Sequence, residues 1–487
     1  MNNVLNQKYI FFYIFLCLSL HILSTHFSIG FHSDDEHFQI LEPIAYLLGV
    51  NDKVINDLEG FYWEWQNDKR MRPWLQPMLY YHLIKILKFF NFNDPFVWTF
   101  IIRLFSSIIG IISIIYLFFT TKNEFFKKNT HFNYLLFFTF WFFPFLHSRT
   151  SSENLGLSFF IIALSFFYSE FKKNNNKFNY LLYLNFSFFL GLALVFKFSL
   201  IFSVIPILLW IFLFRFNFLK VACISIGILI ALGAGLIIDS IYWGFYTNTY
   251  WQFYNHNIIL GRLNAFGTEP WWFYIPQIII DLAPLLSLFF IFSLVLFWIK
   301  KTKSIFTWIT LFTLIIISFI GHKETRYAFS IYIFAPLFIS FFFENFKRLK
   351  FENFYKTIII VSNIIFLILT LFTPANSKVD VYKFLFNNYS KNDNVYYLDE
   401  NPYMINDMEA LFYTHTLPKI IKFDKNNLNS NTFSIRSWII TNENDSYELL
   451  LKNKNCLKRY NTYPEKIINL NDNWKKHRLN WYIFSCS

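Results

Sequence analysis

Charge is scarce in this sequence. Of its 487 residues, 15% are charged and 55% are hydrophobic, which is too apolar for a soluble protein of this size and predicts many membrane-spanning segments. Cysteine is scarce as well: Cys17 and Cys223 lie in apolar segments, and Cys456 and Cys486 in a polar tail. Their spacing matches no metal-ligand or redox motif, and the chain shows no internal repeat of ~20–50 residues.

The formal net charge of +12 would fit a nucleic-acid-binding protein, but the distribution of the cations does not. They occur in short loops between apolar runs, as the positive-inside rule describes. We therefore expect no nucleic-acid partner. The first apolar run, from Tyr9 to Gly30, is as long as a full span and lacks the cleavage pattern of a signal peptide, so we interpret it as a retained span.

Apolar runs predict an all-α polytopic membrane protein with about eleven transmembrane helices, or about twelve if residues 75–90 also span. Residues 75–90 are interrupted by Gln76, Lys85 and Lys88, and we interpret them as an interfacial or re-entrant helix. The expected spans are Tyr9–Ile29 and residues 97–119, 133–148, 154–170, 178–196, 199–214, 219–239, 273–299, 305–320, 327–345 and 356–373.

Two domains are expected. Residues 1–373 would form the transmembrane domain, with residues 31–96 as a long first loop outside the cytoplasm. Residues 374–487 contain strand-like runs at 394–398 and 438–441 and are predicted to form a small extracytoplasmic α/β domain.

A single alternation of the spans separates two kinds of loop. With the N-terminus in the cytoplasm, every cytoplasmic loop is basic, as that side requires. The loops on the other side hold residues 34–36, 149–153, 239–272 and 322–326. The residues suited to chemistry are therefore predicted to lie on the extracytoplasmic face.

Three consecutive carboxylates, Asp34, Asp35 and Glu36, directly follow the first span. Carboxylates avoid apolar surroundings unless they are paired or bound to a cation, so a cluster at the mouth of a span indicates a functional site. A divalent-metal site is one interpretation, but no second dense acidic cluster occurs in another outer loop, which favours a general base. A solvated acidic loop also fits. Neighbours in an extended loop point to opposite sides, so Asp34 and Asp35 should not share the role.

Two outer clusters have both functional and structural interpretations. Arg149 and Glu153 stand between two spans, where a serine and a glutamate also suit a helix cap. Asp239 ends an otherwise apolar run, and an aromatic belt, which explains Trp271 and Trp272, does not explain it.

A third outer cluster combines His322, Lys323 and Arg326. Cations at a membrane surface, above all the planar guanidinium of arginine, suit the phosphate of a lipid. The structural alternative is an internal ion pair of Glu324 with Lys323 or Arg326, which contributes little when exposed.

In this order, the motifs resemble a family of lipid-linked mannosyltransferases. It includes the GPI mannosyltransferases and the ER α-1,2- and α-1,6-mannosyltransferases of N-glycan assembly (glycosyltransferase family 22, GT-C fold). The family's first-loop pattern, His-Pro-Asp-Glu-x-x-Gln-x-x-Glu, is similar to residues 35–42, its Thr-Trp-Glu-Trp to residues 62–65 and its Arg-Ser-x-Leu-x-Pro to residues 72–77. Later motifs of the family match Arg149-Thr150 with Glu153, Asp239 with Tyr242 and Gly244, residues 266–271, and residues 322–326.

The resemblance covers about residues 9–345 and departs from the family pattern at two positions. Asp34 stands where the family has proline, and His32 lies one position earlier than the family's histidine. Alignment on Glu36 and Gln39 favours Asp35 as the base, with Glu36 and Asp34 as further catalytic candidates. The resemblance also implies substrate or donor contacts for Gln39, Glu42, Trp63, Glu64, Arg72, Arg149, Glu153, Asp239, His322, Lys323 and Arg326.

What the resemblance implies is inverting transfer of a mannosyl residue from polyprenyl- or dolichyl-phosphate-mannose to a glycolipid or glycan acceptor, without a metal or other cofactor. The expected location is a bacterial cytoplasmic membrane, or the ER membrane of a eukaryote. A transporter or flippase of lipid-linked sugars is the alternative class, with Asp35, Glu36 and Asp239 as a relay. It would show charges within spans and symmetry between half-chains, and the sequence shows neither. An accessory binding role for the polar tail is a third possibility.

Overall fold

The computed structural model describes residues 2–50, 63–66, 69–126, 130–172, 179–345, 351–390, 393–425, 436–453, 455–468 and 480–486. Its contacts divide the chain into two compact units. The first comprises Met1–Thr25, Trp63–Leu79 and Ile101–Leu371, and the second comprises His26–Tyr62, Tyr80–Phe100 and Phe372–Ser487. The second unit thus joins much of the expected first loop to the polar tail. Basic residues at 127–128, 173–177 and 347–350, expected in the cytoplasm, lie outside the described residues.

The first unit is helical, and its apolar residues form one continuous phenylalanine-rich core. The helices are apolar on most sides, which suits contact with lipid. A helix also satisfies its backbone polar groups within the segment, as the interior of a membrane requires. The helices lying mostly in this unit are α1 (Asn2–Phe27), α6 (Pro95–Phe125), α7 (Thr130–Phe138), α8 (Phe142–His147), α9 (Ser152–Lys172), α10 (Tyr180–Phe196), α11 (Ile201–Arg215), α12 (Phe218–Trp243), α13 (Thr249–Tyr254), α14 (Tyr274–Asp281), α15 (Pro284–Lys300), α16 (Ile305–Phe319), α17 (Phe329–Tyr332), α18 (Ala335–Asn345) and α19 (Glu352–Phe372).

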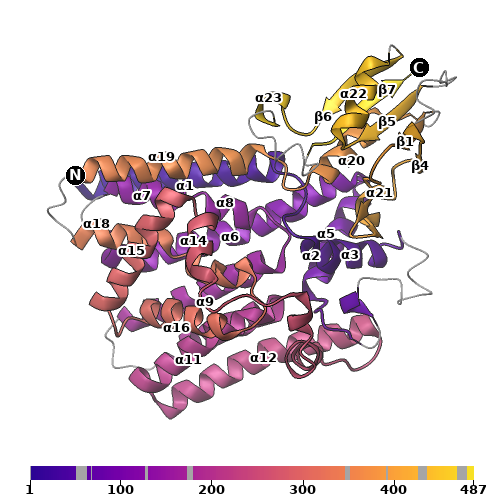
Figure 1. Cartoon of the computed structure of the whole chain (residues 1–487). Coiled ribbons are helices and arrows are strands. Elements are labelled where there is room, and N and C mark those ends of the chain that lie inside the picture. Colours follow the sequence, from indigo (N-terminus) through magenta and orange to yellow (C-terminus); the bar gives the residue numbers. More distant parts are fainter. Residues whose placement is uncertain are drawn as a thin grey trace. The chain divides into compact units, whose positions relative to one another are not determined.

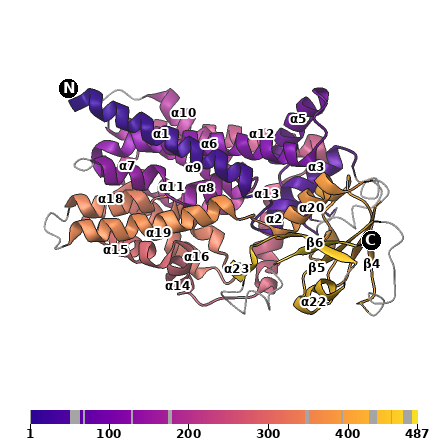
Figure 2. The ribbon, with the colours of Figure 1, turned by 90° about the horizontal axis from the view of Figure 1, so that it is seen from above.

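Helix α10 packs against both α9 and α12, α11 against α16, and α15 against α18 (Figures 1 and 2). Glycine permits the closest of these contacts. A Cβ atom at Gly227 of α12 would lie 2.0 Å from the Ser187 hydroxyl of α10, so a side chain there would force the two helices apart.

Five helical segments are long and apolar enough to cross a membrane: Tyr9–Phe27, Pro95–Phe125, Phe198–Arg215, Phe218–Trp243 and Glu352–Phe372. Two bent pairs, α15 with α16 (118°) and residues 325–332 with α18 (43°), bring the number among the described residues to at most seven. Several apolar helices are therefore present, as predicted, whereas the expected count of about eleven stays a prediction.

Three expected spans are each broken into two helices: residues 327–345 form α17 and α18, and for the other two spans the structure shows the cause of the break. Residues 133–148 form α7 and α8, and the buried Asn363 of α19 binds both sides of the break. Its side chain donates to the Thr139 carbonyl (2.8 Å) and accepts from the Trp141 N–H (3.0 Å). Residues 273–299 form α14 and α15, because Ala283 adopts φ +71° directly before Pro284, and a residue before proline is disfavoured in helical conformation.

The second unit combines short helices with a five-stranded sheet. Its helices are α2 (Asp34–Glu36), α3 (Glu42–Leu47), most of α5 (Leu75–Phe89), α20 (Ser377–Asn388), α21 (Leu411–Thr414), α22 (Asn444–Lys452) and α23 (Glu465–Ile468). Its strands are β1 (Asn394–Tyr397), β2 (Met404–Ile405), β3 (Met408–Glu409), β4 (Ile420–Lys422), β5 (Ser437–Thr441), β6 (Cys456–Asn461) and β7 (Tyr482–Cys486). The predicted small C-terminal sheet region is thus present, whereas a separate extracytoplasmic domain over residues 374–487 stays a prediction.

The sheet has the order β4-β1-β5-β7-β6, with β1 parallel to β4 and β5, and β7 antiparallel to β5 and β6. Alternate residues of a strand point to opposite faces. Ile439 of β5 accordingly packs with Leu450 of α22, whereas the neighbouring Trp438 meets Phe384 of α20. The domain therefore has one helix on each face of the sheet.

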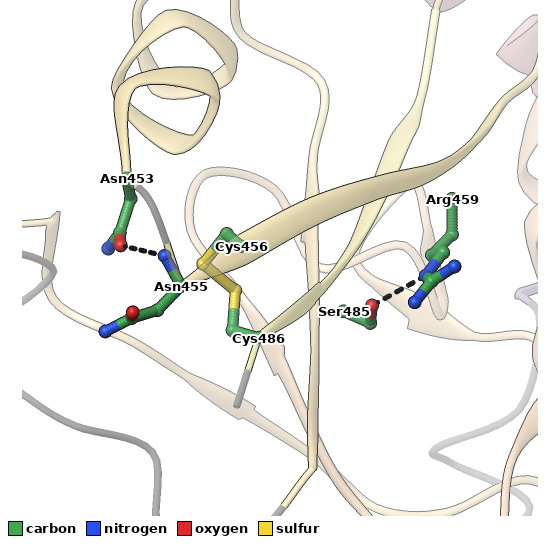
Figure 3. The surroundings of a disulfide bond; sticks show 6 residues. All are labelled: Asn453, Asn455, Cys456, Arg459, Ser485 and Cys486. Atoms are coloured by element: carbon green, nitrogen blue, oxygen red, sulfur yellow. Dashed lines mark hydrogen bonds between the residues drawn. A yellow bond between two sulfur atoms is a disulfide. The ribbon is translucent and has the colours of Figure 1, made fainter.

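A disulfide joins Cys456 to Cys486, which face each other at the ends of β6 and β7 (Figure 3). The Arg459 side chain of β6 also donates a hydrogen bond to the Ser485 hydroxyl of β7 (2.8 Å). These contacts fasten the edge strand β6 to β7, its neighbour in the sheet.

Candidate functional site

The acidic stretch is helical, and the expectation of an extended loop is wrong. Asp34–Glu36 forms α2, which continues through a π-helical turn at His37–Leu41 into α3. Consecutive side chains on a helix diverge by about 100° rather than pointing to opposite sides. Asp34 and Asp35 are half-buried, whereas Glu36 is buried and accepts a hydrogen bond from the His32 N–H (3.3 Å).

Glu42 is a buried anchor within the second unit. One of its carboxylate oxygens lies 2.7 Å from His37 Nε2 and accepts a hydrogen bond from the Phe412 N–H (3.0 Å). Tyr413 stacks on the His37 ring at 5.9 Å. This arrangement holds the polar tail against the helix that carries the acidic stretch. Gln39 lies in the π-helical turn His37–Leu41 and is also buried.

Asp239, in the first unit, binds a segment of the expected first loop. It is fully buried near the end of α12 and accepts hydrogen bonds from the Trp74 N–H (2.7 Å) and the Thr249 hydroxyl (2.6 Å). The Trp74 ring stacks on Tyr242 at 5.6 Å. The carboxylate is thus satisfied by two donors, which explains how a charged group is tolerated there.

The motif at residues 63–65 meets the arginine that follows it. The Arg72 guanidinium pairs with the buried Glu64 carboxylate, while the side chain of Trp63 lies outside what the structure describes. The guanidinium also lies 5.6 Å from the centre of the Phe253 ring, in cation–π range.

The cluster at residues 149–153 and the cluster at residues 322–326 come together in a chain of ion pairs. Glu153, in the first turn of α9, lies 2.6 Å from Lys197 Nζ and 3.2 Å from Arg326 Nη1. Arg326 Nη2 lies 2.7 Å from Glu324, whose other oxygen is 3.5 Å from His322 Nε2. The Arg326 side chain keeps 19% of its surface exposed, so an anion could still reach it.

Glu153 directly precedes the expected span 154–170, and two neighbouring cations keep its carboxylate ionised. Burial alone would raise its pKa, but Lys197 and Arg326 outweigh that effect and lower the pKa to about 2. Glu153 is therefore an anion at neutral pH, and its geometry suits the positioning of two cations rather than proton transfer. Arg149, four residues earlier, is buried.

Lys323 has a different environment from Arg326. Its side chain is only 7% exposed, and its ammonium group donates to the carbonyls of Ser318 (3.0 Å) and Ile320, at the C-terminal end of α16. Burial lowers the pKa of Lys323, and the charge of Glu269 opposes that shift. A cation in this position satisfies helix carbonyls and the helix dipole.

The structure thus brings the predicted residues together in groups within each unit. Asp34, Asp35, Glu36, Gln39 and Glu42 share one helical segment of the second unit. The first unit holds the Asp239 anchor, the Glu64–Arg72 pair and the ion pairs of Glu153 and Arg326. In the part of the chain that the structure describes, no group of three or more His, Cys, Asp or Glu side chains could hold a metal ion.

Sequence reasoning missed several residues with clear roles. Lys197 was not among the candidates, although a lysine between two apolar runs needs a carboxylate partner. Asn363 was hidden inside an expected span. The Cys456–Cys486 pair was missed because no motif spacing marks it, yet two cysteines in a tail expected outside the cytoplasm are the signal that indicates a disulfide.

The fold has close counterparts among solved structures. The crystal structure of ArnT from Cupriavidus metallidurans bound to undecaprenyl phosphate matches with a TM-score of 0.56 and 9% identity over 98% of each chain. The apo form of ArnT gives 0.53 and 8%, again over 98% of both chains. The protein therefore has the GT-C fold of multi-pass membrane glycosyltransferases.

Residues 11–408 match the model of the Alg9-like mannosyltransferase family, and the chain belongs to this family. It is 23% identical over 334 residues to mannosyltransferase APTG1 of Arabidopsis thaliana, covering 68% of this chain and 58% of that protein. It is also 23% identical over 319 residues to GPI alpha-1,2-mannosyltransferase 3 of Bos taurus, with 65% and 56% covered. The chain thus spans little more than half the length of these curated relatives.

Proposed function

We propose that this protein transfers a mannosyl residue, with inversion, from polyprenyl- or dolichyl-phosphate-mannose to a glycolipid or glycan acceptor. The observation that carries the proposal is the family match over residues 11–408, a range that includes all the candidate residues. Nothing in the comparisons supports the transporter or flippase alternative.

Asp35 is the proposed general base. An acceptor hydroxyl attacks the anomeric carbon from the face opposite the lipid phosphate, and a carboxylate within hydrogen-bond reach takes its proton. The alignment of the family's first-loop pattern on Glu36 and Gln39 supports this choice. Of the two neighbours, Asp34 accepts a hydrogen bond from Asn406 (2.5 Å), and the buried Glu36 accepts one from the backbone of His32. Glu36 is proposed to orient Asp35 or the acceptor.

Arg326 is the proposed ligand of the leaving lipid phosphate. The phosphate departs without protonation but needs positive charge nearby as the bond breaks. The Arg326 side chain, which is partly exposed, is suited to bind it, and Glu153 and Glu324 would hold the guanidinium in position. A lipid-phosphate donor needs no nucleotide-binding metal, so we propose that transfer is independent of divalent cations.

The proposed arrangement in the membrane has about eleven spans, with the candidate residues and the polar tail on the extracytoplasmic or lumenal side. The Cys456–Cys486 disulfide supports this orientation, because disulfides persist in oxidising compartments. The exposed apolar side chains of Ile86, Phe89 and Phe90 at the end of α5 support an interfacial helix. We propose a bacterial cytoplasmic membrane, or the ER membrane in a eukaryote.

The test is sugar transfer by the purified protein in proteoliposomes that contain labelled polyprenyl-phosphate-mannose and a glycolipid fraction from a deletion strain. Mass analysis of that fraction would identify the accumulated acceptor, and the product should form equally with EDTA present. Movement of the donor across the bilayer without sugar transfer would refute the proposed enzyme and favour the transporter.

Orientation is tested by cysteine-accessibility labelling in intact cells. We expect labels at position 35 to react from outside and labels at position 301 from the cytoplasm only. Labelling of both positions from the same side would contradict the proposed membrane topology.

A further inference from the structure

A polar cleft of about 510 Å³ lies beside the acidic stretch of the second unit. Its size is within the ~300–1,000 Å³ range of clefts that bind small molecules. Four segments line it: Asp34, the first residues of α20 (376–378), Glu400-Asn401 after β1, and residues 404–407.

A tight hairpin forms one wall of the cleft. Strands β2 and β3 are joined by Asn406 and Asp407, which both have positive φ (49° and 62°). Two such residues make a type I′ turn, whose conformation Asn and Asp tolerate better than most residues do. Both side chains are exposed, and the Asn406 amide donates to Asp34 at 2.5 Å.

The topology of the sheet independently marks the same edge as a binding location. Strand β1 lies between two parallel neighbours, with β4 on one side and β5 on the other. After β1 the chain first adds β4 on one side of it and then crosses over to add β5 on the other side. In open sheets with parallel strands, ligands bind beyond the carboxyl ends at such a switch point. Glu400 and Asn401, which follow the carboxyl end of β1, line the cleft.

The lining favours a neutral ligand with many hydroxyl groups. It offers three carboxylates, from Asp34, Glu400 and Asp407, against one ammonium group, from Lys378. Lys378 is already paired with Glu400 and donates to the Met404 carbonyl (2.8 Å), so an anionic phosphate would meet net negative charge.

Three asparagines and a serine supply the rest of the polar lining. Carboxylates accept hydrogen bonds and amides both donate and accept them, which matches the hydroxyls of a sugar.

We propose that this cleft binds the neutral sugar moiety of the acceptor. Asp34 is then a wall of the acceptor cleft, and Asp35, the next residue on the same helix, is adjacent to the bound hydroxyls. The inference rests on the proposed function and deepens it, since it assigns the acceptor's sugar to a cleft of the second unit.

Glycine substitutions test the cleft without straining the turn. Asn406→Gly and Asp407→Gly remove the side chains but tolerate positive φ. Asn91→Gly is the matched control, because Asn91 also has positive φ (64°) and does not line the cleft. The probe is octyl α-D-mannopyranoside, titrated into the detergent-solubilised full-length protein and also used as acceptor in the transfer assay.

Asp407→Gly should weaken probe binding and raise the KM for the probe roughly 10- to 100-fold, the effect of losing one hydrogen bond to a charged group. Asn406→Gly should do so roughly 2- to 10-fold, the effect of losing a hydrogen bond between neutral groups. kcat at saturating probe and binding of the lipid-phosphate donor should stay near the wild-type values, and Asn91→Gly should match the wild type throughout.

The outcomes separate the cleft from the proposed function. Wild-type protein that does not bind the probe, or cleft variants that bind it like wild type, would overturn the cleft even if sugar transfer is observed. Probe binding that the cleft variants lose, in a protein that transfers no sugar from any polyprenyl-phosphate donor, would support the cleft and refute the proposed mannosyltransferase.

Discussion

The two units use their charged residues in opposite ways. In the first unit, Asp239 and Glu153 are buried and satisfied by scaffold partners. In the second unit, Asp34 lines an open cleft, and Asp35, one residue further on, is half-buried. A carboxylate with fixed partners is suited to hold other groups in place, whereas a carboxylate that borders a cleft can meet a substrate. The comparison predicts proton transfer by the acidic stretch of the second unit and positioning of other groups by the two buried carboxylates of the first.

The largest effect is expected from Asp35→Asn. The amide keeps the size of the side chain but does not accept a proton at neutral pH, so transfer should fall by ~10²–10⁴-fold. Single-turnover transfer by the purified variant measures this, with donor binding checked separately. Asp34→Asn is the matched control and should lose less. A dead Asp34→Asn beside an active Asp35→Asn would move the base by one residue, and two active variants would exclude the acidic stretch from catalysis.

The second-largest effect is expected from Arg326→Ala, which tests whether the first unit binds the donor phosphate. Loss of a charge-assisted contact costs about 1.5–3 kcal/mol, so donor use should fall roughly 10- to 150-fold in kcat/KM. Glu269→Ala, which removes an exposed carboxylate from the neighbouring loop, should change it little. Wild-type kinetics in a correctly inserted Arg326→Ala protein would exclude this residue as the phosphate ligand.

Lys323→Ala should affect stability more than donor use, because its ammonium group binds the carbonyls at the end of α16. Thermal unfolding of the variant in detergent, compared with its donor KM, separates the two effects. A large increase in donor KM with unchanged unfolding would show that Lys323 contacts the donor instead.

Asp239→Ala tests the structural role of a buried carboxylate. Two buried donors, the Trp74 N–H and the Thr249 hydroxyl, would lose their acceptor, at a cost of about 1–3 kcal/mol each. Thr249→Val removes only one of these bonds and should destabilise the protein less. Thermal unfolding should rank the two variants in that order, and an Asp239→Ala protein of normal stability but without activity would give Asp239 a direct role in the reaction.

The smallest effect concerns the α/β domain. Burial raises the pKa of Asp399, but hydrogen bonds from Lys425, Thr441 and Ser446 outweigh it, so the pKa is lowered. A lowered pKa in the folded state stabilises the domain above the unfolded-state value of ~3.9, and this stability is lost as pH falls below it. Asp399→Asn should therefore lower stability at pH 7 by about 1 kcal/mol, and the difference from wild type should shrink toward pH 3.

The sequence predicted several apolar helices because the length of an apolar span follows directly from the thickness of the membrane. It placed the strands at 394–398 and 438–441 within about a residue of β1 and β5. It did not predict the breaks in the expected spans, two of which depend on a distant side chain, Asn363, and on one backbone angle at Ala283. A hydropathy profile shows neither a contact with a distant side chain nor a backbone angle.

The candidate residues were predicted by motif, and so was the ion pair of Glu324 with Arg326, but most of the other partners were not. Glu153 and Arg326 are 173 positions apart in sequence, and only the packing of α9 near the 325–328 turn makes them an ion pair. The helix at Asp34–Glu36 was likewise missed, since three consecutive acidic residues have no apolar periodicity from which to recognise it.

The strand order of the α/β domain has a consequence for how the protein is made. Strand β7 lies between β5 and β6 in the sheet, although it follows both of them in the sequence. While a ribosome is still synthesising residues before 482, β5 has a bare edge and β6 has no partner. Unpaired strand edges attract other chains, so a premature stop or a stalled translocation before this segment would leave an aggregation-prone domain rather than a slightly shortened one.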